Sequence, residues 1–319
     1  MTQSFDAQTV DSTGVFFATQ LNRIDPVLNT PLADFTYARD IDIAPLDVAD
    51  EQTSFDSVKY AATGGVEAAG PSFVSSKVTE IGTVGVDLQR VTAGTFLWAQ
   101  AVQKTVIELA QAQKLGRPLD AMLLDAMNMK LNVDMQNHVY LGYTPNAGTA
   151  IKGLLNSTQV TAATVATGVG GFLWTQKTDD EILADINTLL TAAWQASGFT
   201  IMPDRLGLPP LKFSYLVSRK IANQTMSLLT YLSQNTMANN INGKPLDIVP
   251  MREAVGAGAG ATDRMIAYRK RADVVRIPKS PVLSVPVQFV GLYQKAIYYT
   301  RFGTVEFVKP EAVRYADGF

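Results

Sequence analysis

Apolar residues recur with a period of 3.6 in two adjoining stretches of the chain, and each stretch predicts a helix. Within residues 92–115, Trp98 and Val102 fall on one helical stripe, and Gly116 stands where a left-handed C-terminal cap belongs. A proline suits the first turn of the second helix, which is predicted over residues 118–139. The pattern therefore predicts two consecutive helices in the first half of the chain.

Two further helices are predicted farther along. Thr178 and Glu181 form a capping box, because each side chain can accept a hydrogen bond from the other residue's backbone N–H. The helix behind this box carries apolar residues at helical spacing and ends near Gly198. Residues 219–234 show the same spacing and predict another helix.

Other stretches alternate between apolar and polar residues, which is the period of a strand. Residues 37–50 alternate in this way, and residues 53–90 hold two β-prone arms around a Gly- and Ala-rich tip at residues 63–71. Such arms predict a long hairpin with too few large apolar residues for a core of its own, so we expect it to pack on another molecule. Strands are also predicted in the second half, over residues 246–250, 265–268, 285–290, 296–300 and 304–308. Together these elements predict an α+β protein.

The N-terminal stretch, residues 1–36, has no sustained period. It is either an arm that orders only against neighbouring molecules or a disordered tail. It shows neither the basic start nor the apolar run of a secretory signal, and no stretch of the chain reaches the roughly 18 apolar residues of a membrane span. We therefore expect a soluble cytoplasmic product with no membrane partner.

The composition offers few of the side chains that enzymes commonly use for catalysis. The chain has no cysteine and one histidine, His138, which rules out disulfides, thiolate sites and multi-histidine metal centres. The glycine-rich residues 256–260 lack the Lys-Ser/Thr ending of a phosphate loop and predict a flexible surface loop. We expect no cofactor and no metal. An enzyme would have to use carboxylates or tyrosine, and would show acids converging in a concave pocket.

Charge is distributed unevenly, although the net charge is only -2. Residues 1–200 hold 11 basic and 21 acidic side chains, and residues 201–319 hold 16 basic and 8 acidic ones. Three readings stay open. The two halves neutralise each other within a subunit, or acidic and basic faces meet between copies, or basic surface attracts nucleic acid without sequence preference.

The order of elements resembles the HK97-type major capsid fold of tailed bacteriophages. Several short sequence motifs, called phrases below, resemble segments of those shell proteins as well, and the resemblance extends over about residues 20–315. The phrases are Val-Tyr-Leu-Gly-Tyr to Ile-Lys-Gly-Leu-Leu-Asn within residues 139–156, Met-Pro-Asp at 202–204, Leu-Pro-Pro at 208–210, Tyr-Leu at 231–232 and Arg-Ile-Pro at 276–278.

The resemblance implies a major capsid protein that self-assembles, as hexamers and pentamers, into an icosahedral shell around double-stranded DNA. It implies no enzymatic activity, assembly in the host bacterial cytoplasm, and a final place in the virion capsid. The alternative is an encapsulin-like compartment that encloses an enzyme. The implied domains are an N-terminal arm (1–36), a peripheral-domain strand (37–52), an extended loop (53–88), a peripheral domain with a spine helix at 93–115 (89–145), an α/β axial domain (146–283) and closing peripheral strands (284–319).

The implied partners are other copies of the chain, a portal protein, a separate scaffolding protein, a decoration protein and the packaged DNA. A separate scaffold is expected because no long helical pro-segment precedes the arm, although a short arm alone sometimes suffices. The lysines on the hairpin arms lie away from its tip, and no catalytic carboxylate matches a motif, so we expect a shell without covalent crosslinks. The candidate assembly contacts are the charged residues Asp40, Asp42, Asp47, Asp50, Glu51, Lys59, Glu67, Lys77, Arg269, Lys270, Arg271, Arg276 and Lys279.

Overall fold

The structure is a computed structural model that describes residues 33–63, 76, 83–116, 118–144, 150–221 and 226–319, with the side chains of residues 59–63 excepted. The chain divides into residues 1–34 and a compact unit of residues 35–319, and the fold is that of the second unit. The predicted arm therefore lies almost wholly outside the described residues, and so does the tip of the predicted hairpin.

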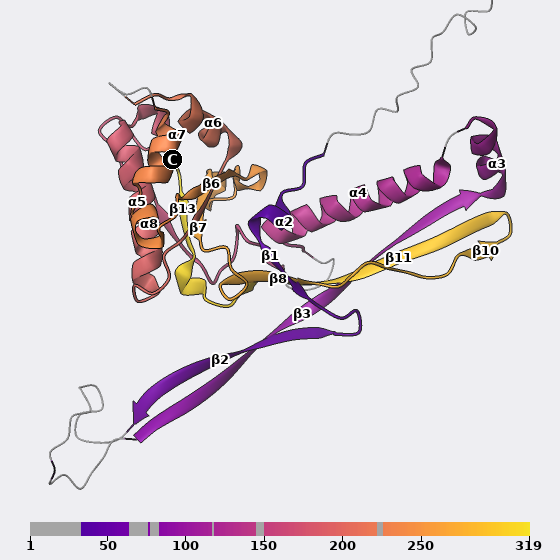
Figure 1. Ribbon diagram of the computed structural model, residues 1–319, viewed down its shortest axis with the longest axis horizontal. Helices are drawn as coiled ribbons and strands as arrows, with labels where there is room; N and C mark the ends of the chain where they lie inside the picture. The colour runs from indigo at the N-terminus through magenta and orange to yellow at the C-terminus, as the bar shows by residue number, and fades with distance from the viewer. Residues whose placement is uncertain (1–32, 64–75, 77–82, 117, 145–149, 222–225) are drawn as a thin grey trace, which may run out of the picture. The chain divides into compact units, whose positions relative to one another are not determined.

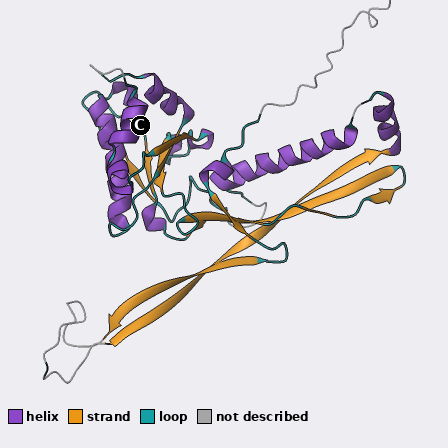
Figure 2. Cartoon of the chain, in the orientation of Figure 1, coloured by secondary structure: helices purple, strands orange, loops and turns teal. Residues whose placement is uncertain are grey.

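Helices and strands are mixed along the chain, as the sequence predicts for an α+β protein (Figure 2). The helices are α2 (Tyr37–Asp40), α3 (Val106–Lys114), α4 (Leu119–Tyr140), α5 (Asp179–Ala196), α6 (Pro210–Ser218), α7 (Leu228–Asn235) and α8 (Met237–Asn242). The strands are β1 (Asp42–Pro45), β2 (Gln52–Thr63), β3 (Thr83–Thr105), β4 (Thr161–Thr164), β5 (Arg205–Leu208), β6 (Asp247–Pro250), β7 (Arg264–Tyr268), β8 (Val275–Lys279), β9 (Leu283–Ser284), β10 (Gln288–Val290), β11 (Tyr293–Gly303), β12 (Glu306–Phe307) and β13 (Arg314–Asp317).

The strand β3 organises the larger of two sheets. Its first half pairs antiparallel with β2, and its second half pairs antiparallel with β11. The change of partner falls between Gly94, which lies opposite Gln52, and Thr95, which lies opposite Gly303. The sheet continues from β11 through β8 to β1, with β9, β10 and β12 at its margins. Beyond β11, therefore, β2 and β3 form a two-stranded ribbon (Figure 1).

The helix predicted over residues 92–115 is wrong for most of its length. Residues 92–105 belong to β3, and only Val106–Lys114 is helical. Threonines, valines and aromatic residues in this stretch favour a strand, and pairing with β11 supplies backbone hydrogen bonds that the sequence spacing cannot reveal. Trp98 faces the next helix instead, where its indole Nε1–H donates to Asp134 Oδ2 over 2.9 Å.

A capping box marks the true start of this helix. The Thr105 hydroxyl accepts from the Glu108 backbone N–H over 3.0 Å, and the Glu108 carboxylate accepts from the Thr105 N–H over 2.8 Å. This is the signature recognised at Thr178 and Glu181, where the structure confirms it. The long helix is α4, as predicted for residues 118–139, and it runs alongside β3 and β11 (Figure 1).

Four other predictions need correction. Tyr37–Asp40 is a short helix and not the start of a strand, so the predicted strand over residues 37–50 shrinks to β1. The helix predicted over residues 219–234 is confirmed only in the part that α7 covers, while α6 before it was missed. The strands predicted over residues 285–290 and 304–308 are reduced to β10 and β12 within those stretches. The strands at 246–250, 265–268 and 296–300 are confirmed by β6, β7 and β11.

The smaller sheet has the order β4-β13-β7-β5-β6 and carries a core on each face. Successive side chains of a strand point to opposite faces, and β7 is buried throughout. Ile266 and Tyr268 therefore join one cluster, while Met265 and Ala267 join the other. The second cluster is closed by apolar faces of α5, α6 and α7.

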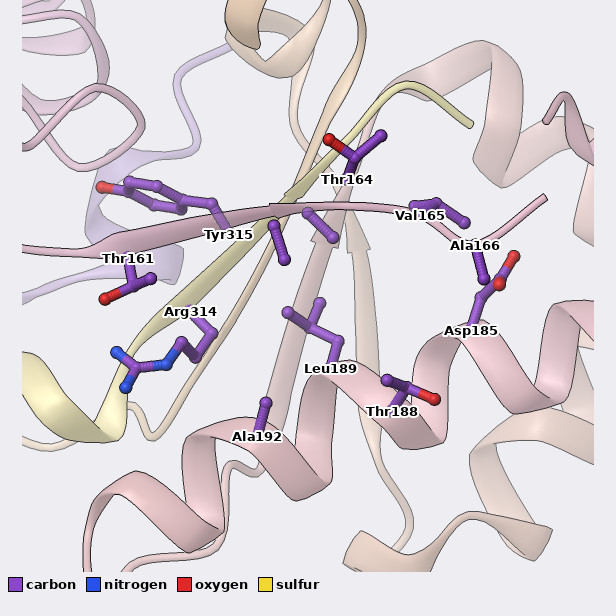
Figure 3. A pocket seen from close by; sticks show the side chains of 12 residues that line it. Thr161, Thr164, Val165, Ala166, Asp185, Thr188, Leu189, Ala192, Arg314 and Tyr315 are labelled. Carbon is purple, nitrogen blue, oxygen red and sulfur yellow. The ribbon is translucent and has the colours of Figure 1, made fainter.

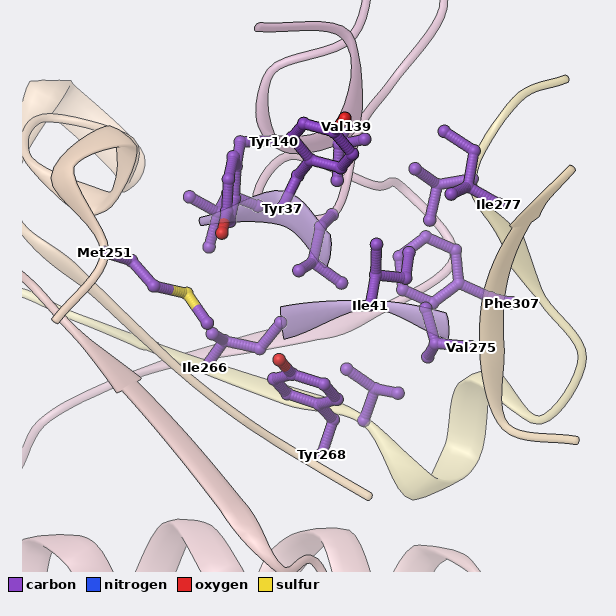
Figure 4. Close-up of a cluster of buried hydrophobic side chains, with 14 of the residues drawn as sticks. Tyr37, Ile41, Val139, Tyr140, Met251, Ile266, Tyr268, Val275, Ile277 and Phe307 are labelled. Atoms are coloured by element: carbon purple, nitrogen blue, oxygen red, sulfur yellow. The ribbon is translucent and has the colours of Figure 1, made fainter. Parts of the chain in front are cut away.

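The first cluster joins the two sheets through the short N-terminal elements. Ile41, just after α2, packs among residues from α4, β7, β8 and β12 (Figure 4). The phrase at residues 139–156 forms one edge of this cluster. Gly142 has φ +80°, and Gly153 lies so close to the Tyr140 carbonyl that a Cβ there would be only 2.6 Å from its oxygen. These glycines let the chain turn back after α4 and bury two successive leucines, Leu154 and Leu155.

Candidate assembly surfaces

The outer part of one face of the β2–β3 ribbon is apolar and is not covered by the described residues of the subunit. Val84, Val86 and Leu88 alternate along β3 and are 76%, 60% and 68% exposed, and Val58, opposite Leu88 on β2, is 46% exposed. The intervening Asp87 and Gln89 point to the other face. We name Val58, Val84, Val86 and Leu88 the ribbon ladder. A two-stranded ribbon has no second layer of its own, and no described element of the subunit covers this ladder, which favours its burial against another molecule.

A second uncovered apolar cluster lies at the other end of β3. The turn between β10 and β11 meets the start of α3, where the Val106 N–H donates to the Leu292 carbonyl over 3.0 Å. Large apolar side chains around this contact are exposed: Val106, Ile107, Val287, Phe289, Val290, Leu292 and Tyr293. This cluster was not predicted from the sequence, although the density of large apolar residues around the Gly291 turn is a signal for it.

Asp42 of the predicted acidic patch lies beside the predicted basic patch within one subunit. Strand β1 pairs parallel with β8, so that Asp42 lies opposite Arg276 in the register. Asp42 Oδ1 is 4.0 Å from Lys270 Nζ, and the same amine donates to the Arg39 carbonyl over 2.6 Å. For these residues the contacts favour neutralisation within the subunit, one of the readings that the sequence left open.

Asp40 does not belong to a surface patch. Its carboxylate is fully buried, accepts from the Arg39 guanidinium over 2.7 and 2.9 Å, and contacts Arg205 Nη1 over 3.2 Å. The Tyr140 hydroxyl donates to the same carboxylate. Burial, and next the Asp40 charge, raise the pKa of Tyr140 well above its usual value. Asp40 is therefore an internal contact between α2, α4 and β5, which corrects its assignment as an assembly residue.

The other basic candidates also have partners in their own chain. Arg276 Nε donates to Glu306 Oε2 over 2.7 Å, Arg271 pairs with Asp273, and Arg269 Nε lies 4.0 Å from Asp204. The Lys279 amine sits 5.8 Å from the centre of the Tyr37 ring, and partial burial lowers the pKa of Lys279. Each of these cations is therefore compensated or half-buried before any second copy approaches.

The acidic turn between β1 and β2 is different. Asp47, Asp50 and Glu51 are exposed there and have no ion-pair partner among the described residues. These three stay candidates for contacts between copies. The Lys59 side chain, Glu67 and Lys77 lie outside the described residues.

Comparison with known proteins agrees with this picture. The family model described as "Major capsid protein" matches residues 68–319, well over half of the chain. The chain belongs to the major capsid protein family. A major capsid protein is a structural shell subunit and not an enzyme. Among curated proteins, none matches this chain in sequence.

Solved structures share the fold of this capsid protein over nearly its whole length. The capsid chain of Myoviridae phage XM1 is similar with a TM-score of 0.77 and 17% identity, covering 96% of this chain and 99% of that one. A chain of Mycobacterium phage Adephagia has a TM-score of 0.61 and 13% identity over 99% and 98% of the two chains. The capsid of a native GTA particle has a TM-score of 0.60 and 14% identity over 98% and 99%. These likenesses confirm an HK97-type capsid fold.

One pocket of the capsid protein contains no converging catalytic groups among its described residues. The pocket in Figure 3, about 190 Å³, lies between β4, β13 and α5 and is lined mostly by small side chains. Its one carboxylate, Asp185, already accepts from Lys177 Nζ over 2.6 Å and from Trp174 Nε1 over 3.1 Å. No group of three or more His, Asp or Glu side chains in the described part is placed to hold a metal ion, and no described helix is long and apolar enough to cross a membrane.

The single histidine of the capsid protein has a structural role. The His138 ring lies with its centroid 6.2 Å from those of Phe96 and Phe302, and Nε2–H donates to the Gly303 carbonyl over 2.8 Å. Burial lowers the pKa of His138, so the folded state resists protonation more than the unfolded state. Stability from this group is fully present above the unfolded pKa of about 6.5 and is lost as pH falls below it.

We expect the free energy of unfolding of the subunit to decrease as pH falls below about 6.5, and His138→Gln to remove that part of the decrease. Glutamine can still donate to the Gly303 carbonyl but does not titrate. Urea unfolding at a series of pH values, for the wild type and the variant, measures the difference. Parallel curves for the two proteins between pH 7 and 5 would contradict this role of His138.

Proposed function

We propose that this major capsid protein assembles, through hexamers and pentamers, into the icosahedral shell of a tailed bacteriophage, and that the shell encloses double-stranded DNA. The observation that carries the proposal is the uncovered ribbon ladder, in a fold that matches phage capsid chains over nearly their whole length. An exposed apolar face on a ribbon without a second layer favours coverage by a neighbouring copy. Rings form when such head-to-tail contacts close by rotation.

The predicted domains fit this function. We infer that residues 53–88 form the extended loop, that residues 89–145 and 284–319 form the peripheral domain, and that residues 146–283 form the axial domain. The spine helix is then α4 rather than residues 93–115, because residues 92–105 are a strand. The ribbon ladder lies on the extended loop in this assignment, which places it where a neighbouring subunit would cover it.

The other predicted partners belong to the same proposal. A portal protein, a separate scaffolding protein and a decoration protein would act during assembly in the host bacterial cytoplasm and in the finished virion. The packaged DNA would be attracted without sequence preference by cationic surface. Because many basic side chains are already compensated within the subunit, this attraction is expected to be weak and dependent on salt.

Negative-stain electron microscopy and sedimentation velocity of the purified full chain test the proposal. We expect closed particles, or rings of six and five subunits, either from the chain alone or when other morphogenesis proteins are co-expressed. A species that stays monomeric under both conditions would overturn the proposal. The cargo separates virus from compartment, because packaged nucleic acid supports the phage function, whereas an enzyme enclosed in every particle supports the encapsulin-like alternative.

A further inference from the structure

A polar crevice lies at the root of the ribbon, and its floor contains a carboxylate that is only half satisfied. The crevice, about 430 Å³, is bounded by the acidic turn, the first residues of β2 and the strands β8 and β12. On its floor Glu306 lies opposite Arg276 in the register of β12 and β8. The principal polar residues lining it are Asp50, Gln52, Thr53, Ser54, Arg276 and Glu306.

Glu306 lacks one hydrogen-bond donor. Its side chain is only 2% exposed, and its Oε2 accepts from Arg276 Nε over 2.7 Å. Its Oε1 is buried and has no hydrogen-bond partner in the described part of the chain. A buried charged oxygen without a donor carries a substantial desolvation cost, and buried polar atoms in folded proteins nearly always have a partner. A donor that enters the crevice from outside the subunit would supply this missing hydrogen bond.

The charge of the crevice favours a cationic donor. Among the described residues that line it, Arg276 is the one cation, against Asp50 and Glu306, and the adjoining turn adds Asp47 and Glu51. A metal ion is disfavoured because the described residues contain no group of three or more acidic or histidine side chains placed to hold one. An amine or guanidinium group fits both the missing hydrogen bond and the excess negative charge.

The chain itself carries suitable amines. The exposed arginines Arg39, Arg90, Arg252 and Arg271 each have a carboxylate partner already. Four lysines are exposed and have no ion-pair partner among the described residues: Lys114, Lys152, Lys220 and Lys244. In a shell of identical subunits, every neighbouring copy carries these same four lysines.

We propose that the crevice at Glu306 receives a lysine side chain from a second copy of this chain, whose amine donates to the Glu306 carboxylate. The inference rests on the proposed function, since it requires assembly. It assigns Glu306 to contact between copies, with Asp50 providing further negative charge at the mouth. The contact orders the ribbon root relative to the neighbour, because the same crevice joins the start of β2 to the large sheet.

A cryo-electron microscopy map of the wild-type shell tests the contact directly. We expect a lysine amine of a neighbouring copy within hydrogen-bond distance of the Glu306 carboxylate. A crevice that holds only water, or only side chains of its own subunit, would overturn the inference while the shell itself upheld the proposed function. If the wild type formed no shell, both the inference and the proposed function would be contradicted.

A pair of variants tests the energetic contribution. Glu306→Gln removes the charge with little change of shape, and we expect the protein concentration at half-assembly to rise about tenfold or more, which corresponds to about 1.4 kcal/mol. Glu311→Gln is the matched control, since Glu311 is exposed and has no ion-pair partner in the described part. Thermal unfolding of the unassembled subunits separates loss of folding from loss of contact. Equal assembly of the two variants would contradict the role of Glu306.

Discussion

Val86→Asp should abolish shell formation and leave the isolated subunit folded. Val86 is the middle β3 residue of the ribbon ladder and is 60% exposed in the subunit, so an aspartate there remains solvated before assembly. Exposed substitutions of this kind usually change the free energy of unfolding by less than about 0.5 kcal/mol. A neighbouring copy that covers the ladder would instead have to bury an unpaired carboxylate, which costs several kcal/mol at each contact.

Sedimentation velocity and electron microscopy measure the loss of particles, and urea unfolding measures the subunit. Gln89→Asp is the control, because it places the same charge on the opposite face of the same strand, where Gln89 is also exposed. We expect Gln89→Asp to assemble at nearly the wild-type concentration. Shells formed by Val86→Asp at wild-type concentration would show that the ladder does not face a neighbour.

Local signals in the sequence were sufficient for some elements of the fold. The capping box at Thr178 and Glu181 and the apolar face of α5 predicted that helix correctly, because both depend on residues within a few positions of each other. The long helix α4 was predicted for the same reason, from a proline at its start and apolar residues at helical spacing. The order of elements and the phrases at 139–156 then indicated the family, which the family match confirms.

The predictions from sequence failed where the structure depends on contacts between residues far apart in the chain. The stretch 92–105 carries apolar residues whose spacing fits a helical stripe, yet most of it, residues 95–105, pairs with β11 at residues 293–303, far along the chain. The sequence shows a surplus of acidic residues before residue 200 and of basic residues after it. Whether the two signs meet within one subunit depends on contacts such as the pairing of β1 with β8. The local sequence of β3 does not reveal that β11 is its partner, and the local sequence of β1 does not reveal that β8 is its partner.

Asp40 shows the same limit for a single side chain. In the sequence it stands in a run of acids, which is typical of a solvated surface. In the structure, the four-residue helix α2 turns its carboxylate inward toward groups from α4 and β5. The contacts that bury Asp40 come from residues about 100 and 165 positions away, so no local pattern predicts them.

Asp40→Asn should therefore destabilise the subunit by about 3–5 kcal/mol, as expected when one member of a buried charge cluster is neutralised. The substitution leaves Arg205 Nη1 and the Tyr140 hydroxyl facing an amide that can satisfy only some of these donors. Arg39 is 38% exposed, so solvent screens its share of the loss, and most of the effect comes from Arg205, which is 11% exposed. A loss of this size is a large part of the 5–15 kcal/mol that holds a typical domain folded.

Urea unfolding of the unassembled subunit at neutral pH measures this loss. Asp42→Asn is the matched control, because Asp42 stands two residues away, is 35% exposed, and lies 4.0 Å from Lys270. A partly solvated pair at that distance contributes at most about 1 kcal/mol. If both variants lose the same small amount, the Asp40 carboxylate does not hold α2, α4 and β5 together, and the junction depends on its other contacts, such as the apolar packing of Ile41 and Tyr37. If Asp40→Asn alone unfolds at markedly lower urea, the buried carboxylate fixes the position of α2, and with it the start of the strand that leads into the ribbon.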